Sequence, residues 1–143
     1  MAVIMVDTDV HSYITASDPG RGLPYRQHLD GQTIALSFAS VGEQYAGYLK
    51  QISRGRWPAT RLEKLETGLQ LVVIVPYDIE VCRTFGDLKT TTERYGRSVA
   101  VSDLWIAACA KRHSLKLVTN NREHFDAIPG LEVISEAPGE RTR

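Results

Sequence analysis

Short apolar runs alternate along the chain with longer stretches in which apolar residues recur every three or four positions. The runs have the composition of buried strands and lie at residues 2–6, 33–38, 71–75, 115–119 and 131–134. The helical spacing between them predicts helices from about Thr8, from Ser40 to Gly55, over 58–69, over 78–95, over 102–113 and over 122–128. Residues 17–23 hold a proline and two glycines and predict a turn.

This alternation predicts an α/β fold with one parallel sheet of four or five strands and helices on both faces. The composition of residues 71–75 indicates a central strand. The helix at 102–113 is apolar nearly all round, so we expect it to be buried against the sheet. Residues 1–135 are expected to form one domain and residues 136–143 a flexible tail.

Composition narrows the functional classes. The 143 residues are 43% hydrophobic and 24% charged, as in a soluble globular domain, and the formal net charge is zero. A nucleic-acid partner would therefore need a local basic patch. The sequence shows no signal peptide and no apolar stretch that could span a membrane, so a cytoplasmic location is expected. Cys82 and Cys109 are expected to be buried thiols rather than a disulfide.

Two carboxylates one residue apart, Asp7 and Asp9, follow the first apolar run directly. The carboxyl ends of parallel strands carry the site in such folds. Asp7 alone could simply cap the helix that follows it, as many aspartates do. At the same edge we expect Thr119 and Asn121, which end the run "LVTNN".

Two further acids occupy unusual places. Asp103 falls in the first turn of the buried helix, after Ser102, which we expect to cap that helix, and Asp103 could merely complement the helix dipole. Glu43 lies off the apolar stripe of its helix, on a face shared with Ala46 and Gly47, and could be solvated. Gathered together, these acids would raise one another's pKa unless a cation held them ionised. Spacing alone leaves open whether they bind Mg²⁺ or Mn²⁺ or are structural.

The opening "VDTDV" also fits two other kinds of site. It resembles the nucleophile loop of haloacid-dehalogenase-type phosphatases, but Thr119 is the best strand-end hydroxyl, and no lysine or acidic strand end follows it. The sequence therefore does not favour a phosphatase of that type. An EF-hand loop is excluded because His11, Ser12 and Thr15 occupy positions that need a third ligand, a glycine and a final glutamate.

Three stretches together resemble one known family. They are "VDTDVHSYI", "SFASVGEQYAG" and "VSDLWIAACAKRHSLKLVTNNREHFDAIPGLEVI". The chain resembles a PIN-domain ribonuclease of the VapC toxin type from Val3 to Ile134. The resemblance implies a PIN-like three-layer fold and a metal-dependent endoribonuclease. It places the family's metal-binding carboxylates on Asp7, Glu43 and Asp103, the strand-end hydroxyl on Thr119, and a supporting position on Asp9.

One position departs from the family pattern. Many members carry a fourth acid shortly after the strand-end threonine, where this chain has Asn121 and His124. Asn121 offers a carbonyl oxygen without charge, and Glu123 and Asp126 are the nearest acids. Because the fourth acid is missing, a second, permanently bound metal ion is not expected.

The four histidines have no zinc-ligand spacing and are interpreted as structural.

The resemblance also implies partners: an RNA substrate, a VapB-like antitoxin and a second copy in a homodimer. A basic cluster around the third and fourth helices could contact RNA, with Trp57 either as a stacking platform or as an anchor between helices. Its members are Arg54, Arg56, Arg61 and Lys64. The competing class is a non-catalytic PIN-fold binding module, against which the three retained acids argue.

Overall fold

A computed structural model, which describes residues 2–15 and 19–137, has a five-stranded sheet in which every neighbouring pair is parallel. The strand order is β3-β2-β1-β4-β5. The strands are β1 (Val3–Val6), β2 (Thr33–Ser37), β3 (Val73–Val75), β4 (Leu117–Val118) and β5 (Val133–Ile134). The prediction of a parallel α/β fold is confirmed.

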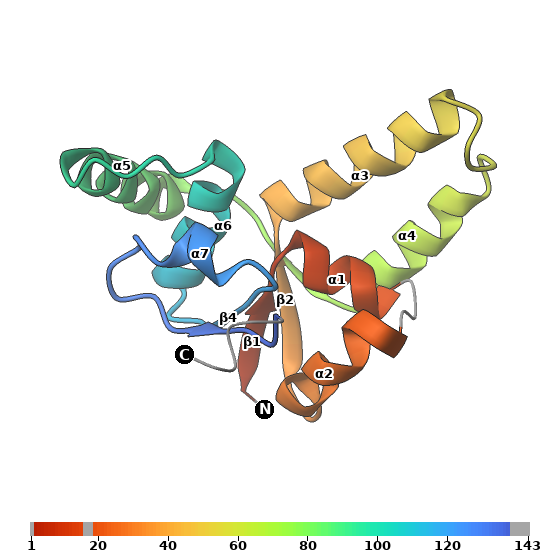
Figure 1. The fold of residues 1–143 in the computed structure, drawn as a ribbon, viewed down its shortest axis with the longest axis horizontal. Coiled ribbons are helices and arrows are strands. Elements are labelled where there is room, and N and C mark those ends of the chain that lie inside the picture. The colour runs from red at the N-terminus through yellow and green to blue at the C-terminus, as the bar shows by residue number, and fades with distance from the viewer. Residues whose placement is uncertain (1, 16–18, 138–143) are drawn as a thin grey trace.

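The helices cover both faces of the sheet (Figure 1). They are α1 (Thr8–Thr15), α2 (Pro19–Leu29), α3 (Phe38–Ser53), α4 (Arg61–Leu69), α5 (Ile79–Arg94), α6 (Val101–Arg112) and α7 (Arg122–Phe125). Because side chains alternate along a strand, Ile4 and Val6 pack with α1, α2 and α4, whereas Met5 packs with α5 and α6. No helix in the described ranges is long and apolar enough to cross a membrane.

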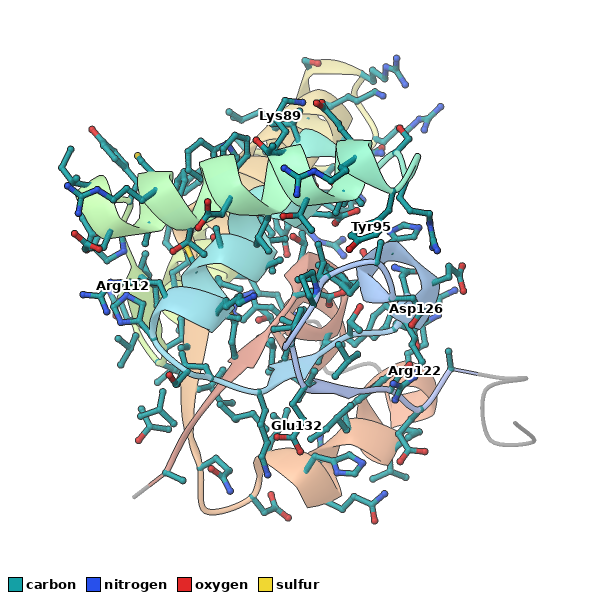
Figure 2. The ribbon with its side chains drawn as sticks, turned by 90° about the vertical axis from the view of Figure 1, so that its left-hand side faces the viewer. Lys89, Tyr95, Arg112, Arg122, Asp126 and Glu132 are labelled. Atoms are coloured by element: carbon teal, nitrogen blue, oxygen red, sulfur yellow. The ribbon has the colours of Figure 1, made fainter. Side chains whose placement is uncertain are left out.

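Helix α6 is buried as its composition predicts, since six of its residues from Leu104 to Ala110 are inaccessible. Figure 2 shows α5 lying across α6, and Lys89 and Tyr95 are labelled along and just beyond α5. The two thiols differ from each other. Cys109 on α6 is buried, as expected, but Cys82 on α5 is exposed, so that prediction is wrong. Both thiols are free, so the expectation that they form no disulfide is confirmed.

The prediction that residues 71–75 form a central strand is wrong. β3 is the edge strand, and Val73 and Ile74 are 52% and 43% exposed. An apolar composition marks a strand but does not fix its place in the sheet. The centre is taken by β1, which has β2 on one side and β4 on the other.

The predicted turn at 17–23 is also wrong over its described part, because Pro19 opens α2; its first two positions lie outside the described residues. A proline fits the first helical position, where its missing N–H is not needed. Gly22 lets α2 pack closely on α1, since a Cβ there would lie 3.3 Å from the Tyr13 carbonyl oxygen. Helix α2 tolerates Pro24 in its interior.

Helices α3 and α4 begin two or three residues away from their predicted starts. Helix α3 begins at Phe38, because the Ser37 hydroxyl caps it by accepting the Ala39 N–H at 3.1 Å. Helix α4 begins at Arg61 rather than Pro58. Residues 54–60 join α3 to α4 and form the end of the hairpin farthest from the sheet (Figure 1).

The predicted tail begins with two residues that the structure anchors. The Glu136 carboxylate pairs with His28 on α2 at 2.8 Å, and Ala137 is buried. The rest of the predicted tail, 138–143, lies outside the described residues.

Candidate active site

The order in which strands are added to the sheet reverses at β1, because β2 and β3 lie on one side of it and β4 and β5 on the other. Ligands of open parallel sheets bind at such a switch point, beyond the carboxyl ends of the strands. Asp7 ends β1 there, and Thr119 ends β4. The two strand ends are joined by the Asp7 N–H, which donates to the Val118 carbonyl at 3.0 Å.

Asp7 is both a helix cap and a buried charge at this point. One carboxylate oxygen accepts the Val10 N–H at 2.9 Å, as in an N-cap, and the other accepts the Thr119 hydroxyl at 2.5 Å. Only 5% of the residue is exposed. Burial raises the pKa of Asp7 from its ordinary value of 3.8 to about 6; the charges of Asp9 and Asp103 add to the rise, and the two hydrogen bonds oppose it.

Asp103 is the second carboxylate of the site whose pKa is raised. It lies in the first turn of α6, but Ser102 is not the cap; the helix begins at Val101 behind Ala100, whose carbonyl accepts the Leu104 N–H at 3.0 Å. Burial raises the pKa of Asp103, the nearby His124 opposes this, and the charges of Glu43 and Asp9 raise the pKa further.

Glu43 approaches the site from α3. The residue is exposed, and its carboxylate accepts the Thr8 hydroxyl at 2.8 Å, which ties α3 to the start of α1. Its charge contributes to the raised pKa of Asp103, after burial and the opposing effect of His124, so the two carboxylates lie within electrostatic reach of each other. We call Asp7, Asp9, Glu43 and Asp103 the acidic cluster. The small-residue face beside Glu43 is open, since no described atom lies near an added Cβ at Gly42 or Gly47.

Asn121 connects two parts of the cluster. Its side-chain amide donates to Asp9 at 2.9 Å, and its backbone N–H donates to the Thr119 hydroxyl at 3.0 Å. The hydroxyl thus accepts from Asn121 while it donates to Asp7. The structure brings together Asp7, Thr119, Asn121 and Asp9, as their predicted places at one sheet edge require.

Sequence reasoning missed two contributors, Thr8 and His124. His124 on α7 pairs with Asp103 at 3.2 Å, so the interpretation of every histidine as structural does not hold for it. Its place shortly after Thr119, where relatives often carry an acid, was the available signal. His11 and His28, which bond Gln44 and Glu136, do act inside the fold.

The side chains fit a hard divalent ion by their chemistry, although they do not form a closed cage. Within residues 2–15 and 19–137, no three Asp, Glu, His or Cys side chains stand close enough to enclose a metal ion. Mg²⁺ takes one or two carboxylates directly and keeps several waters, so it does not need such a cage. Burial, and after it the charges of neighbouring carboxylates, raise the pKa of Asp7 and of Asp103, and a bound cation would offset both effects.

The predicted basic cluster lies apart from the acidic cluster. Arg54 and Arg56 belong to the segment at the far end of the α3–α4 hairpin. Trp57 packs edge-on against Tyr48, with the Arg61 guanidinium 4.3 Å from its ring centre, so it anchors the hairpin. Lys64 instead lines a cavity between α1 and α4.

A different arginine lies closer to the acids. Arg97 lines a cavity of about 270 Å³ together with Asp103, Glu123 and His124. Asp126, labelled in Figure 2 beside α7, is exposed. Glu123 therefore shares a cavity with the acidic cluster, and the described structure gives Asp126 no contact with it.

Comparison with known proteins gives one family. The PIN domain family matches residues 4–131. Ribonuclease VapC2 of Haemophilus influenzae is 26% identical over 131 residues, which cover 92% of this chain and 96% of that protein. The tRNA(fMet)-specific endonuclease VapC of Shigella flexneri is 24% identical over 131 residues, with the same coverage of both chains.

A solved structure agrees with this comparison. The crystal structure of VapBC2 from Rickettsia felis, bound to a DNA fragment from its promoter, superposes on this fold with a TM-score of 0.78. The two chains are 26% identical, and the match covers 93% of this chain and 98% of that one.

Proposed function

The chain belongs to the PIN-domain family and is a ribonuclease of the VapC type, and from that premise we propose that it is a Mg²⁺-dependent endoribonuclease that inhibits growth as the toxin of a toxin–antitoxin pair. One observation carries the proposal. The Asp7 carboxylate directly follows the central strand at the switch point, where burial, together with the charges of Asp9 and Asp103, raises its pKa to about 6. A merely structural cap needs neither the burial nor the like charges around it.

Asp7 and Asp103 would hold the ion, with Glu43 bound directly or through a water. A bound Mg²⁺ supplies a water of lowered pKa and stabilises the charge that develops on the phosphate. Thr119 fixes the orientation of the Asp7 carboxylate through its hydroxyl, and Asn121 fixes that hydroxyl in turn. His124 holds Asp103 in the same way from α7. Such outer contacts keep the ligands in place before the ion arrives.

The antitoxin is the partner that the related complexes suggest, because the Rickettsia felis structure is a VapBC pair. A cavity of about 550 Å³ lies between α1, α4 and the start of β3, and Ile14, Ile34 and Leu71 contribute to its largely apolar lining. Apolar grooves of this kind receive the apolar face of a partner helix. Leu71→Asp, at a side chain 81% exposed, should weaken binding of the co-expressed antitoxin while leaving RNA cleavage unchanged.

A homodimer would use another exposed apolar surface. The edge strand β3 and the start of α5 expose Val73, Ile74, Tyr77 and Ile79 by 43–68%. An apolar edge strand invites pairing with another chain. Sedimentation should show a dimer for the natural chain and a monomer for Ile79→Lys. A natural chain that sediments as a monomer would contradict the proposed dimer interface.

Cleavage of a labelled single-stranded RNA tests the enzyme directly. The natural chain should cut with Mg²⁺ and stop when EDTA is added, and Asp103→Asn and Glu43→Gln should lower the rate at least a hundredfold. Asp126→Asn is the matched control because Asp126 is an exposed acid outside the cluster. RNA binding without cleavage by the natural chain would favour the non-catalytic binding module instead.

A further inference from the structure

Another cavity lies beside the segment that carries Thr119 and Asn121. It measures about 570 Å³, is formed mainly by α2 with Tyr13 of α1, and is lined by Tyr13, Arg21, Tyr25, Asn120 and Glu136 among others. Resting on the ribonuclease function above, we propose that this cavity binds the base of an unpaired RNA nucleotide beside the scissile phosphate. Asn120 reads that base. We call this cavity the base pocket.

The chain itself places the base pocket next to the site. Asn120 stands between Thr119 and Asn121, which bond Asp7 and Asp9 respectively. Consecutive Cα atoms are about 3.8 Å apart, so the pocket wall and the acidic cluster are contiguous. Tyr13 follows Asp9 by four residues on α1, and residues with that spacing share a helix face.

Electrostatics agrees with this placement. The pKa of Tyr13 is raised chiefly by burial, and the charge of Asp9 is the next cause, followed after an opposing effect of Arg21 by that of Asp7. The Tyr13 hydroxyl is therefore close enough to sense carboxylates of the acidic cluster. A phosphate at the cluster and its own base in the pocket would be neighbouring parts of one nucleotide.

The lining has the chemistry that holds single-stranded bases. Tyr13 offers a half-buried aromatic ring, and the Arg21 guanidinium carbon lies 5.5 Å from the centre of that ring. Bases of unpaired RNA stack on aromatic rings and guanidinium planes. The volume lies in the range of pockets that take small organic groups.

Asn120 is arranged as a donor. The buried Tyr25 hydroxyl donates to the Asn120 amide oxygen at 2.6 Å, which fixes the direction of the amide. No hydrogen bond from the Asn120 NH₂ group is found among residues 2–15 and 19–137. A fixed NH₂ group recognises a base through a keto oxygen or a ring nitrogen at one position of its edge.

Cleavage of an RNA library with randomised single-stranded positions tests this reading. Sequencing of the products gives the base preference at each position around the cut. The natural chain should prefer certain bases at one flanking position, and Asn120→Ala should reduce that preference between about threefold and tenfold. Tyr25→Phe, which keeps the ring but frees the amide, should reduce it less. Gln70→Ala, at an exposed amide that caps the C-terminal end of α4 outside the base pocket, is the matched control.

A second measurement does not need cleavage. Adding each of the four nucleoside 5′-monophosphates should shift the NMR signals of the Asn120 side-chain NH₂, assigned by their loss in Asn120→Ala. Shifts without any cleavage of RNA would leave the base pocket standing and overturn the ribonuclease proposal. Cleavage with identical preferences in the natural chain and Asn120→Ala, and no NMR shifts, would overturn the base pocket and leave the ribonuclease intact.

Discussion

Replacing Asp7 by asparagine should stabilise the metal-free protein above pH 6 and have little effect near pH 4. The geometry survives the change, because the amide oxygen still accepts the Val10 N–H, and the amide NH₂ donates to Thr119 once that hydroxyl rotates. What disappears is a buried negative charge surrounded by like charges. The variant therefore separates the charge of Asp7 from its role as a cap.

The magnitude follows from the pKa of Asp7, which is about 6 in the fold against an ordinary 3.8. The folded state holds this proton more tightly than the unfolded chain does. The natural chain therefore loses stability as the pH rises from 3.8 to about 6, and above that range the full loss of stability remains. A difference of roughly two pH units corresponds to on the order of 3 kcal/mol. For a chain of this size, that is a change in Tm of roughly 6–12 °C.

Thermal melts in EDTA at a series of pH values between 4 and 8 measure the effect. The Tm difference between Asp7→Asn and the natural chain should grow across this range, and the exposed Asp126→Asn should show no such growth. A variant that melts lower than the natural chain by the same amount at every pH would show that Asp7 is only a cap. The electrostatic account of the site would then fail.

Three further changes test neighbouring parts of the account. Thr119→Val, which removes a buried donor to Asp7 and an acceptor for Asn121, should cost about 1–3 kcal/mol in unfolding experiments and slow cleavage. Asn121→Asp should lower the Mg²⁺ concentration needed for half-maximal cleavage, and it should also lower the Tm of the metal-free protein, because a second carboxylate would then lie against Asp9. If neither value changes, Glu123 already supplies the negative charge that Asn121 lacks. If Arg54, Arg56 and Arg61 contact phosphates, their joint replacement by alanine should flatten the salt dependence of RNA binding, and an unchanged slope would place them outside the RNA interface.

The elements and the acids could be predicted because each has a local signature. Five apolar runs gave all five strands, since burial of both sheet faces needs continuous apolar composition. Asp7, Asp9 and Thr119 fall directly after such runs, so the meeting of parallel strand ends places them together without further information. Glu43 stood out only because it lies off the apolar stripe of its helix, and the family resemblance then assigned it to the metal-binding carboxylates.

The failures share one cause, which is that they depend on tertiary neighbours. Whether the run at 71–75 is central or at the edge is set by which strands pair, and nothing within the run records this. Helix α2 looks like a turn because Pro19 and Gly22 also serve turns, and only packing against α1 gives the glycine its role. The pairing of His124 with Asp103 likewise joins two helices that the sequence does not relate.

Manganese binding followed by electron paramagnetic resonance, without RNA, tests the central claim most directly, because Mn²⁺ substitutes for Mg²⁺ at oxygen sites. The natural chain should bind one Mn²⁺ ion, which Mg²⁺ displaces. Asp7→Asn and Asp103→Asn should each weaken that binding at least tenfold, while Asp126→Asn should bind as the natural chain does. Equal Mn²⁺ affinity in all four proteins, or none in the natural chain, would contradict the assignment of the acidic cluster as the metal site of a ribonuclease.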